Sequence, residues 1–304
     1  MRAAGQIEFK RRIKLGISLG VFVCSTLVHF VLRLLGKKPK GFCEVLYYHS
    51  IPASQRMLFV RQLEMLLQYA MPISVGDRIA LKPGKRYAGV TFDDGFENFA
   101  TVALPELRKR KIPSTVFVIA DALGKAFGCA DRFENIMSSQ QVQALPLDHV
   151  TIGSHTSSHP FLPSLSTEDA RREIARSRMQ IEEILNRKVL LFSFPFGGFN
   201  EDLVRICHDA GYQRVFTTLP FSALAAPDEF VVGRVRVDPT DWPLEFRLKL
   251  AGAYCWLPFA FALKRKLFSN MLIRWISGDY HRRYSETLTA QQSAIQESSR
   301  PEVE

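Results

Sequence analysis

The stretch "VTFDDGFENF", residues 90–99, decides the fold and poses the main chemical question about this chain. An apolar run ends in two adjacent carboxylates, Asp93 and Asp94, and Gly95 follows at once. A buried strand normally excludes charge, because an unpaired carboxylate loses its hydration there. Asp-Gly is also a common turn pair. A simple turn is therefore one interpretation of this stretch, and a catalytic pair of carboxylates is the other.

Short β-branched or aromatic runs recur on both sides of this stretch and alternate with helical spacing. Strands are expected at 45–50, 88–93, 114–120, 149–155, 188–194, 214–218 and 230–237. Helices are expected at 98–111, 138–145, 167–186 and 200–210. Strands that are apolar on both sides and alternate with helices predict an α/β fold with a parallel sheet buried on both faces.

Polar residues stand at the ends of several of these strands. Asp93 and Asp94 end one strand, His49 ends the first, His155 ends another, and Pro195 follows a fourth. Active sites of parallel barrels gather at the carboxyl ends of the strands. We therefore expect these residues to share one rim of the sheet.

A metal site would explain why two adjacent carboxylates remain charged. His155 and His159 are four residues apart, a spacing that is often merely structural but that can direct two imidazoles to one point. Two histidines and one aspartate match a catalytic site with open positions for water and substrate. A metal lowers the pKa of bound water to about 7, so the second aspartate could act as a base.

Three motifs in this order resemble the polysaccharide deacetylases of carbohydrate esterase family four. They are "TFDDGF" (91–96), "SHTSSHPFL" (154–162) and "FSFPFGG" (192–198), and the likeness extends over about residues 44–240. The resemblance implies a distorted (β/α)7 barrel. It also implies metal-dependent hydrolysis of an acetamide, or less often of an ester, on a sugar.

The resemblance also implies roles for individual residues. Asp93 takes the place of the general base and Asp94 that of a metal ligand, with His155 and His159 as the other two ligands. The backbone N–H of Phe196 is similar to the family's donor to the tetrahedral oxyanion. The cofactor would be one divalent ion, zinc first, with cobalt, nickel and manganese as alternatives that ligand identity does not separate.

Two further candidates come from motifs that depart from the common pattern. "LYYHS" (46–50) is similar to a branch of the family with an early histidine as general acid, which assigns that role to His49; an ordinary strand-end histidine is the alternative. Many members have an arginine two residues before the proline of the third motif, where this chain has Ser193 before Pro195. Arg234 is the candidate replacement. We group it with Pro195 and Phe196 as the residues expected on the substrate side of the site. The late Leu-His motif is missing.

The charge of the chain is concentrated at its two flanks. Forty Lys and Arg against 30 Asp and Glu give a net charge of +10, but the excess lies in residues 1–41 and 247–283, and residues 42–246 are nearly neutral. Both flanks also hold long apolar runs. This combination favours an anionic membrane surface over nucleic acid as a partner. Five scattered cysteines without a C-x-x-C predict no disulfide framework.

The N-terminal flank, residues 1–41, predicts a basic segment with a transmembrane helix. Residues 15–32 are 18 positions without a formal charge, which nearly span a hydrocarbon core. A cleaved signal peptide and a helix buried in the domain are the competing interpretations. The expected location is a bacterial inner membrane. Basic residues flank the apolar run at both ends, so the positive-inside rule does not decide on which side of the membrane the domain lies.

The C-terminal flank predicts amphipathic helices at the membrane interface. Residues 250–263, "LAGAYCWLPFAFAL", are too short to span and precede a basic cluster. An ordinary C-terminal helix packed on the domain is the alternative. The domain boundaries expected are therefore 1–41 for the anchor, 42–246 for the barrel, 247–283 for the interface helices and 284–304 for a polar, disordered tail.

The combined hypothesis is a membrane-anchored, metal-dependent hydrolase that removes acetyl groups from N-acetylated sugars of a cell-surface or exported polysaccharide. Deacylation of a lipid-linked sugar, as a deformylase or deacetylase, is a second hypothesis. A third is an inactive member of the family that only binds glycan. Loop 121–135 is expected to cover the sugar site, or to be a plain surface loop.

Overall fold

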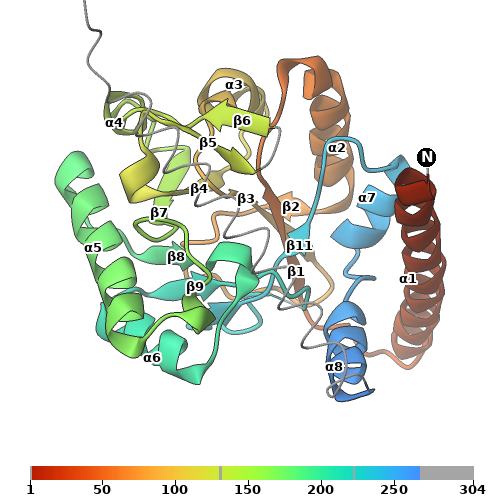
Figure 1. The fold of residues 1–304 in the computed structure, drawn as a ribbon. Coiled ribbons are helices and arrows are strands. Elements are labelled where there is room, and N and C mark those ends of the chain that lie inside the picture. Colours follow the sequence, from red (N-terminus) through yellow and green to blue (C-terminus); the bar gives the residue numbers. More distant parts are fainter. Residues whose placement is uncertain (1, 130–131, 222, 268–304) are drawn as a thin grey trace, which may run out of the picture.

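A curled sheet of parallel strands surrounded by helices forms the centre of the molecule (Figure 1). The computed structural model describes residues 2–129, 132–221 and 223–267. The strand order in the sheet is β10-β9-β8-β7-β4-β3-β1-β11, with β2 also paired to β3, and every pair in it is parallel. This is the predicted distorted β/α barrel. The bounds of these strands are β1 Phe42–Tyr48, β2 Met71–Pro72, β3 Arg86–Phe92, β4 Ser114–Val118, β7 Val150–Ser154, β8 Leu191–Ser193, β9 Arg214–Phe216, β10 Val231–Val232 and β11 Val235–Arg236.

The last predicted strand, 230–237, is wrong as a single element, because the structure divides it into β10 and β11. β10 pairs with β9 and β11 pairs with β1, so the two short strands lie on opposite edges of the sheet. The break falls at Gly233 and Arg234. A Cβ on Gly233 would lie 2.6 Å from the carbonyl oxygen of Leu219, so only glycine fits this close approach. One segment thus joins the two edges and brings Arg234 into the barrel.

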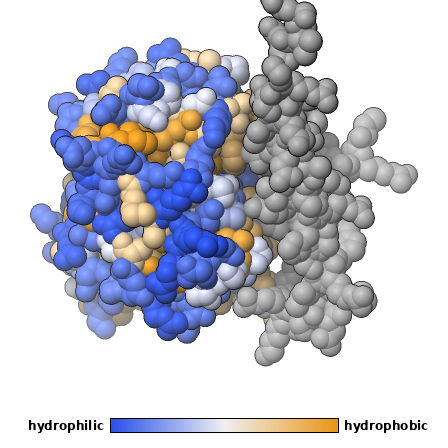
Figure 2. All heavy atoms as spheres, turned by 60° about the vertical axis from the view of Figure 1, so that its left-hand side comes forward, coloured by the Kyte–Doolittle hydropathy of each residue, from blue (hydrophilic) through white to orange (hydrophobic). Residues whose placement is uncertain are grey.

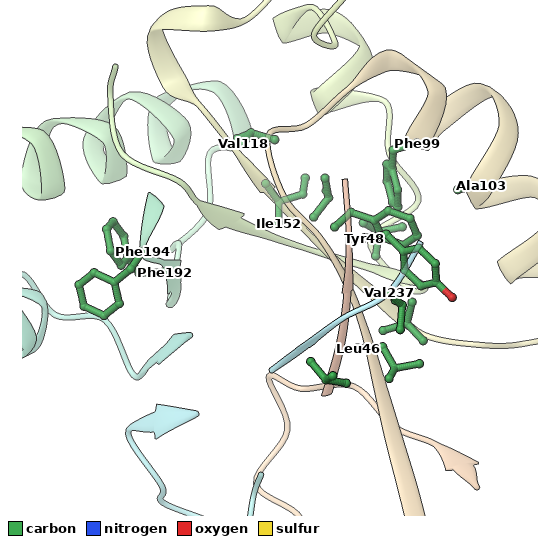
Figure 3. Close-up of a cluster of buried hydrophobic side chains, with 14 of the residues drawn as sticks. Leu46, Tyr48, Phe99, Ala103, Val118, Ile152, Phe192, Phe194 and Val237 are labelled. Atoms are coloured by element: carbon green, nitrogen blue, oxygen red, sulfur yellow. The ribbon is translucent and has the colours of Figure 1, made fainter. Parts of the chain in front are cut away.

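Two hydrophobic layers cover the two faces of the sheet. Successive side chains of a strand point to opposite faces, so Val45 and Phe117 face the barrel interior while Leu46 and Val116 face the helices. Figure 3 shows the outer layer, with Tyr48 near Phe99, and with Phe192 and Phe194 side by side. Both layers are apolar, which explains why the strands appeared in the sequence as continuous apolar runs.

The helices lie outside the sheet, and their bounds differ from the predictions mainly at the ends. Helix α5 matches the predicted 167–186 within one residue, and Ala170, Ile174 and Ile181 of its apolar stripe are buried. The predicted helix 98–111 starts as a π-helical turn before it continues as α3, and α2 was not predicted. The bounds are α2 Arg56–Tyr69, the π turn Phe99–Ala103, α3 Leu104–Lys109, α4 Ser139–Gln143, α5 Thr167–Leu185, α6 Glu201–Asp209 and α7 Pro243–Leu250.

The predicted loop 121–135 holds a two-stranded antiparallel hairpin of β5 (Ala126–Cys129) and β6 (Arg132–Asn135). The hairpin lies next to the carboxyl ends of β3 and β4, because Ile136 bridges to Phe96 in the turn after β3. Short 3₁₀ turns complete the connections, at Ala53–Gln55, Ala120–Ala122, Leu162–Ser164 and Pro195–Gly197.

The two flanks form helices α1 (Arg2–Leu34) and α8 (Leu257–Leu267), which lie on the same side of the barrel as α7 (Figure 1). Among the described residues, α1 holds one stretch long and apolar enough to cross a membrane by length and composition, Glu8–Leu34. The expected interface segment 247–283 begins inside α7, where Leu248 and Leu250 are buried in the core. The predicted tail, 284–304, lies outside the described residues.

Candidate metal centre

The strand register brings the predicted site residues to one rim of the barrel. Tyr48 is aligned with Phe92, so His49 and Asp93 leave the sheet side by side, and the backbone N–H of Asp93 donates to the carbonyl of Tyr48 at 2.9 Å. Ser154 is aligned with both Val118 and Phe192. His155 and the turn at Pro195 therefore leave from the same level as the two aspartates.

Asp94, His155 and His159 form a buried cluster suited to a metal ion. One ligand atom from each lies within 4.8 Å of the others, and the Nε2 atoms of His155 and His159 are 3.5 and 3.4 Å from Oδ1 of Asp94. This Oδ1 atom is buried and has no hydrogen-bond partner among the described residues. An orphaned carboxylate oxygen between two imidazole nitrogens is the geometry that a divalent ion would satisfy.

The turn after β3 directs the two aspartates to different partners. Asp94 and Gly95 both have left-handed backbones, with φ of 69° and 77°. A Cβ on Gly95 would lie 2.9 Å from Cγ1 of Val118, so glycine is required there for both space and conformation. The left-handed turn lets consecutive side chains enter the site in different directions.

His155 is held in the tautomer that a metal ligand needs. Its Nδ1 lies 2.8 Å from the carbonyl oxygen of Ser193, and a carbonyl only accepts hydrogen bonds. Nδ1 therefore carries the proton, and the lone pair of Nε2 faces Asp94. Burial lowers the pKa of His155, although Asp93 and the Ser193 carbonyl oppose this shift, so the ring stays neutral at neutral pH.

The loop from Thr156 to His159 is fixed by a carboxylate of α5. Glu173 accepts the backbone N–H groups of Ser157 and Ser158 at 3.0 and 2.9 Å, and the Ser158 hydroxyl at 2.7 Å. The Thr156 hydroxyl in turn accepts the backbone N–H of His159 at 2.9 Å. His159 itself has a φ of 63°, a strained conformation for a non-glycine residue that these contacts stabilise.

Electrostatics favour a cation at this cluster. Burial, and then the charge of Asp93, raise the pKa of Asp94 to about 8. Burial and the nearby His155 lower the pKa of His159 well below its ordinary value. A buried carboxylate that resists ionisation and two neutral imidazoles are a donor set that a divalent ion stabilises by its own charge.

Asp93 is held by Arg234, the predicted replacement for the missing arginine. The guanidinium donates from Nη1 to Oδ1 at 2.7 Å and from Nη2 to Oδ2 at 2.8 Å, and Nη2 also donates to Oγ of Ser193 at 2.7 Å. Burial alone would raise the pKa of Asp93, but Arg234 and His155 outweigh it and hold the value at about 2.

Arg234 does not face the substrate side, where the sequence grouped it with Phe196. It is fully buried, and its guanidinium lies over the rings of Tyr47, Phe117 and Phe216 at 4.6, 5.4 and 5.8 Å. It reaches Asp93 from the barrel interior. The structure thus places it as a residue that positions Asp93.

His49 lies at the end of β1 on the same rim. Its ring packs edge-on against Tyr47, with centroids 5.6 Å apart. Burial lowers its pKa to about 4, and Asp93 only partly opposes this shift. His49 is therefore neutral at neutral pH and electrostatically coupled to Asp93 and His155.

Pro195 and Phe196 form the turn that follows β8. Pro195 is buried, while Phe196 has a φ of 58° and is 45% exposed. The Phe196 ring packs edge-on against His159, with centroids 4.6 Å apart. A Cβ on Gly197 would lie 1.9 Å from the Thr218 hydroxyl, so the turn is pressed against the strand-end loop beside the cluster.

The hairpin contributes residues that the sequence did not single out. Glu134 accepts from the side-chain amide of Asn98 at 2.6 Å and from the hydroxyl of Ser50, next to His49, at 2.5 Å. Phe127 packs edge-on against His159 at 5.3 Å. Glu134 and Glu173 lack a motif signal, because each acts on a residue distant in sequence.

Comparison with known proteins agrees with this fold. Residues 80–215 match the model of the polysaccharide deacetylase family. A peptidoglycan-N-acetylglucosamine deacetylase of Bacillus cereus is 26% identical over 166 residues, which is 52% of this chain and 47% of that protein. The structure of IcaB from Ammonifex degensii is 28% identical, with a TM-score of 0.60, over 71% of this chain and 98% of that one.

A further solved structure supports the fold alone. The deacetylase PplD of Streptococcus pyogenes, solved in complex with acetate, is 22% identical with a TM-score of 0.57, over 69% of this chain and 98% of that one. The curated relatives are matched over only about half of their own length. The family match over residues 80–215 and these relatives support the polysaccharide deacetylase family for this part of the chain.

Proposed function

We propose that this protein is a metal-dependent hydrolase that removes acetyl groups from N-acetylated sugars of a cell-surface or exported polysaccharide. One observation carries the proposal: the buried Asp94, His155 and His159 cluster stands beside the Asp93–Arg234 pair at the mouth of the barrel. Family membership agrees with deacetylation.

Asp94, His155 and His159 would hold one divalent ion, with zinc as the first choice and cobalt, nickel or manganese as alternatives. Such an ion, when bound, supplies Lewis-acid polarisation of the acyl carbonyl and of the attacking water. The protein fixes the donors beforehand, because the Ser193 carbonyl orients His155 and Glu173 orients the loop of His159.

Asp93 is the proposed general base. Its low pKa keeps it ionised, and Arg234 fixes its plane. Oδ1 also accepts from the Ser193 hydroxyl at 3.4 Å, so Oδ2 retains the lone pair for a water proton. His49, which its low pKa leaves neutral in the resting site, is the proposed general acid: it would take up a proton during the reaction and pass it to the leaving amine. The backbone N–H of Phe196 is the proposed donor to the developing oxyanion, and the turn at Pro195 positions it.

Deacylation of a lipid-linked sugar is the second candidate. The exposed apolar side chains of α1 and α8 favour it, because they would keep the site close to a membrane. The third hypothesis, an inactive glycan binder, rests on the missing arginine and the missing late Leu-His motif. Arg234 contacts Asp93 in place of the arginine, which weakens the first of these grounds.

The experiment is Asp93→Asn in the full chain. We expect hydrolysis of N-acetylglucosamine oligomers to fall by about 10²- to 10⁴-fold, because a positioned base contributes that much. Bound metal per chain should stay unchanged, since Asp93 is not in the ligand cluster. Asp202→Asn, on the exposed face of α6, is the matched control and should keep full activity. Full activity of Asp93→Asn would refute the assignment.

A substrate panel separates the enzymatic candidates. Acetate and formate release is measured from soluble oligomers and from lipid-linked amino sugars, with each divalent ion added in turn. Turnover confined to the lipid-linked set supports the second candidate. Tight metal binding without turnover on either set supports the inactive binder.

A further inference from the structure

Helix α1 is docked on the barrel along one face. Its buried or half-buried side chains recur every three or four residues, which is the spacing of a single helix face. They are Arg11, Leu15, Ser18, Val21, Phe22, Ser25, His29 and Leu32. Ser18 is fully buried, and the indole Nε1 of Trp256 donates to its hydroxyl at 2.9 Å. Contacts with the barrel extend from Arg11 to Phe22 of this helix, which is about 50 Å long, and half-buried side chains continue the same face to Leu32.

Charged contacts fasten the N-terminal half of this face. Nε of Arg11 donates to Glu245 of α7 at 2.6 Å, and its Nη2 donates to the carbonyl of Thr240 at 3.1 Å. The Arg11 guanidinium also lies over the ring of Trp242 at 4.4 Å. Thr240 and Trp242 follow β11, so this end of α1 reaches the rim that carries the candidate metal centre.

The opposite face of α1 is apolar and uncovered. Large hydrophobic side chains there are exposed, among them Phe9, Ile13, Ile17, Val23, Leu27, Val31 and Leu34. Helix α8 adds three more on the same side of the barrel, Phe259 at 77% exposure, Phe261 and Leu263. We call these ten residues the apolar strip. A soluble protein rarely leaves so continuous an apolar surface without a partner.

A helix that crosses the membrane could not keep these contacts. Crossing would put Arg11 on one side of the bilayer and the barrel, with Glu245 and Trp256, on the other. The high mean hydropathy of α1 also includes Leu15 and Phe22, which pack on the barrel core and need no lipid. Composition therefore favours crossing, whereas the contacts of Arg11 and Ser18 with the barrel favour a helix that stays on it.

We propose that α1 and α8 bind an anionic bilayer in its plane, through the apolar strip, so that both ends of α1 and the barrel lie on the same side of the membrane. Exposed cations flank the strip, namely Lys10, Arg12, Lys14 and Arg33, and they match anionic headgroups. The surface on the side of α5 is mostly hydrophilic, in contrast with the apolar strip (Figure 2).

The orientation of the barrel follows from this docking. α1 contacts the rim through Arg11 and lies against the α7–α8 connection through Ser18 and Trp256. The helix thus runs along the barrel wall, and a bilayer beneath it lies parallel to the barrel axis. The mouth of the site then opens along the membrane surface, which suits a glycan that leaves or approaches that surface.

Single cysteines test which side each end of α1 occupies. The full chain, with Cys24, Cys129 and Cys255 replaced by serine, receives Lys10→Cys, Lys38→Cys or Met179→Cys, the last on exposed α5 of the barrel. Each variant is reconstituted in phosphatidylglycerol vesicles and treated with an impermeant maleimide, with and without detergent. In-plane binding predicts equal labelled fractions at the three positions. Labelling of Lys10→Cys that is complementary to the other two would show a crossing helix and overturn the proposal.

Vesicle flotation tests the apolar strip itself. Leu27→Glu with Val31→Glu should weaken binding to phosphatidylglycerol vesicles at least tenfold, whereas Met179→Glu, equally exposed but on α5, should not. Neither readout depends on hydrolysis, so a failure here leaves the proposed function untouched. A chain that forms dimers through the strip and does not float would overturn the proposal in favour of a second copy as the partner.

Discussion

Two adjacent aspartates acquire opposite properties at this site because their neighbours differ. Asp93 meets a fully buried guanidinium, which keeps its pKa at about 2, whereas burial and the charge of Asp93 raise the pKa of Asp94 to about 8. The left-handed turn at Asp94 and Gly95 separates the two side chains. Residues 90–99 therefore contain both a turn and two carboxylates with different chemical properties.

Arg234→Lys tests whether the guanidinium positions Asp93. Lysine keeps the charge but cannot form the two parallel hydrogen bonds at 2.7 and 2.8 Å. We expect kcat to fall about tenfold or more with metal content unchanged. The pKa of Asp93 should rise from about 2, so the acidic limb of the pH–rate profile should move to higher pH. Arg178→Lys, in the Glu182 ion pair of α5, is the control and should leave both unchanged.

Glu44 is a buried carboxylate remote from the metal cluster. It is 2% exposed, and its Oε1 has no hydrogen-bond partner among the described residues. Burial raises its pKa well above 4.5, so the folded state binds a proton that the unfolded state releases. Its contribution to stability is complete below about 4.5 and is lost as the pH rises toward the raised pKa.

Glu44→Gln should therefore stabilise the protein at pH 8 relative to the native chain, and little or not at all at pH 4. Glutamine keeps the shape of the side chain but has no charge to bury. Thermal unfolding at both pH values measures the difference. Glu183→Gln, exposed on α5, is the control and should show no such pH dependence. Equal effects of Glu44→Gln at both pH values would contradict this account.

At the scale of elements, sequence periodicity predicted what depends on local pattern. The parallel strands, helix α5 and the strand-end positions of His49, Asp94 and His155 followed from apolar runs and their ends. The division of the predicted strand 230–237 into β10 and β11 did not follow from this pattern. The two short strands pair with different edges of the sheet, and such pairing depends on how the barrel closes. The resemblance suggested Arg234 as the replacement for the missing arginine, but the bidentate geometry of its contact with Asp93 was visible only in the structure. Helix α2, with a mixed pattern, was missed.

Helix α5 and the loop of His159 form one unit through Glu173. Glu173→Ala removes the acceptor of three hydrogen bonds from Ser157 and Ser158, and the strained φ of His159 loses its support. We expect zinc affinity to fall about 10- to 100-fold, the usual cost of losing a residue that orients a ligand. Isothermal titration of the metal-free protein measures it.

Glu183→Ala is the matched control for this change, because it lies on the same helix and is exposed. It should bind zinc as the native chain does. Unchanged affinity of Glu173→Ala would mean that His155 and Asp94 hold the ion without an ordered loop.

At the scale of the whole molecule, the basic and apolar flanks are parts of the folded barrel as well as candidate membrane elements. Hydropathy detected the apolar run of α1 but could not show that one face of it packs on α7 and on the α7–α8 connection. That information lies in contacts between residues more than 200 positions apart, such as Arg11 with Glu245. The proposed membrane face and the metal centre are thus connected through the contacts of α1 with α7 and with the segment after β11.

A double-mutant cycle of Arg11→Ala and Glu245→Ala measures how firmly the flank belongs to the barrel. The pair is partly buried, with 28% and 9% side-chain exposure, and Lys249 at 3.3 Å from Glu245 shares the network. We expect a coupling free energy of about 1 kcal/mol in thermal unfolding, within the range for residues in one ion-pair network. The pair Arg12 and Glu8, exposed on the helix, should couple by only a few tenths of that value because water screens it. Zero coupling of Arg11 with Glu245 would mean that α1 is detached from the barrel, and the helix would then be free to cross the membrane.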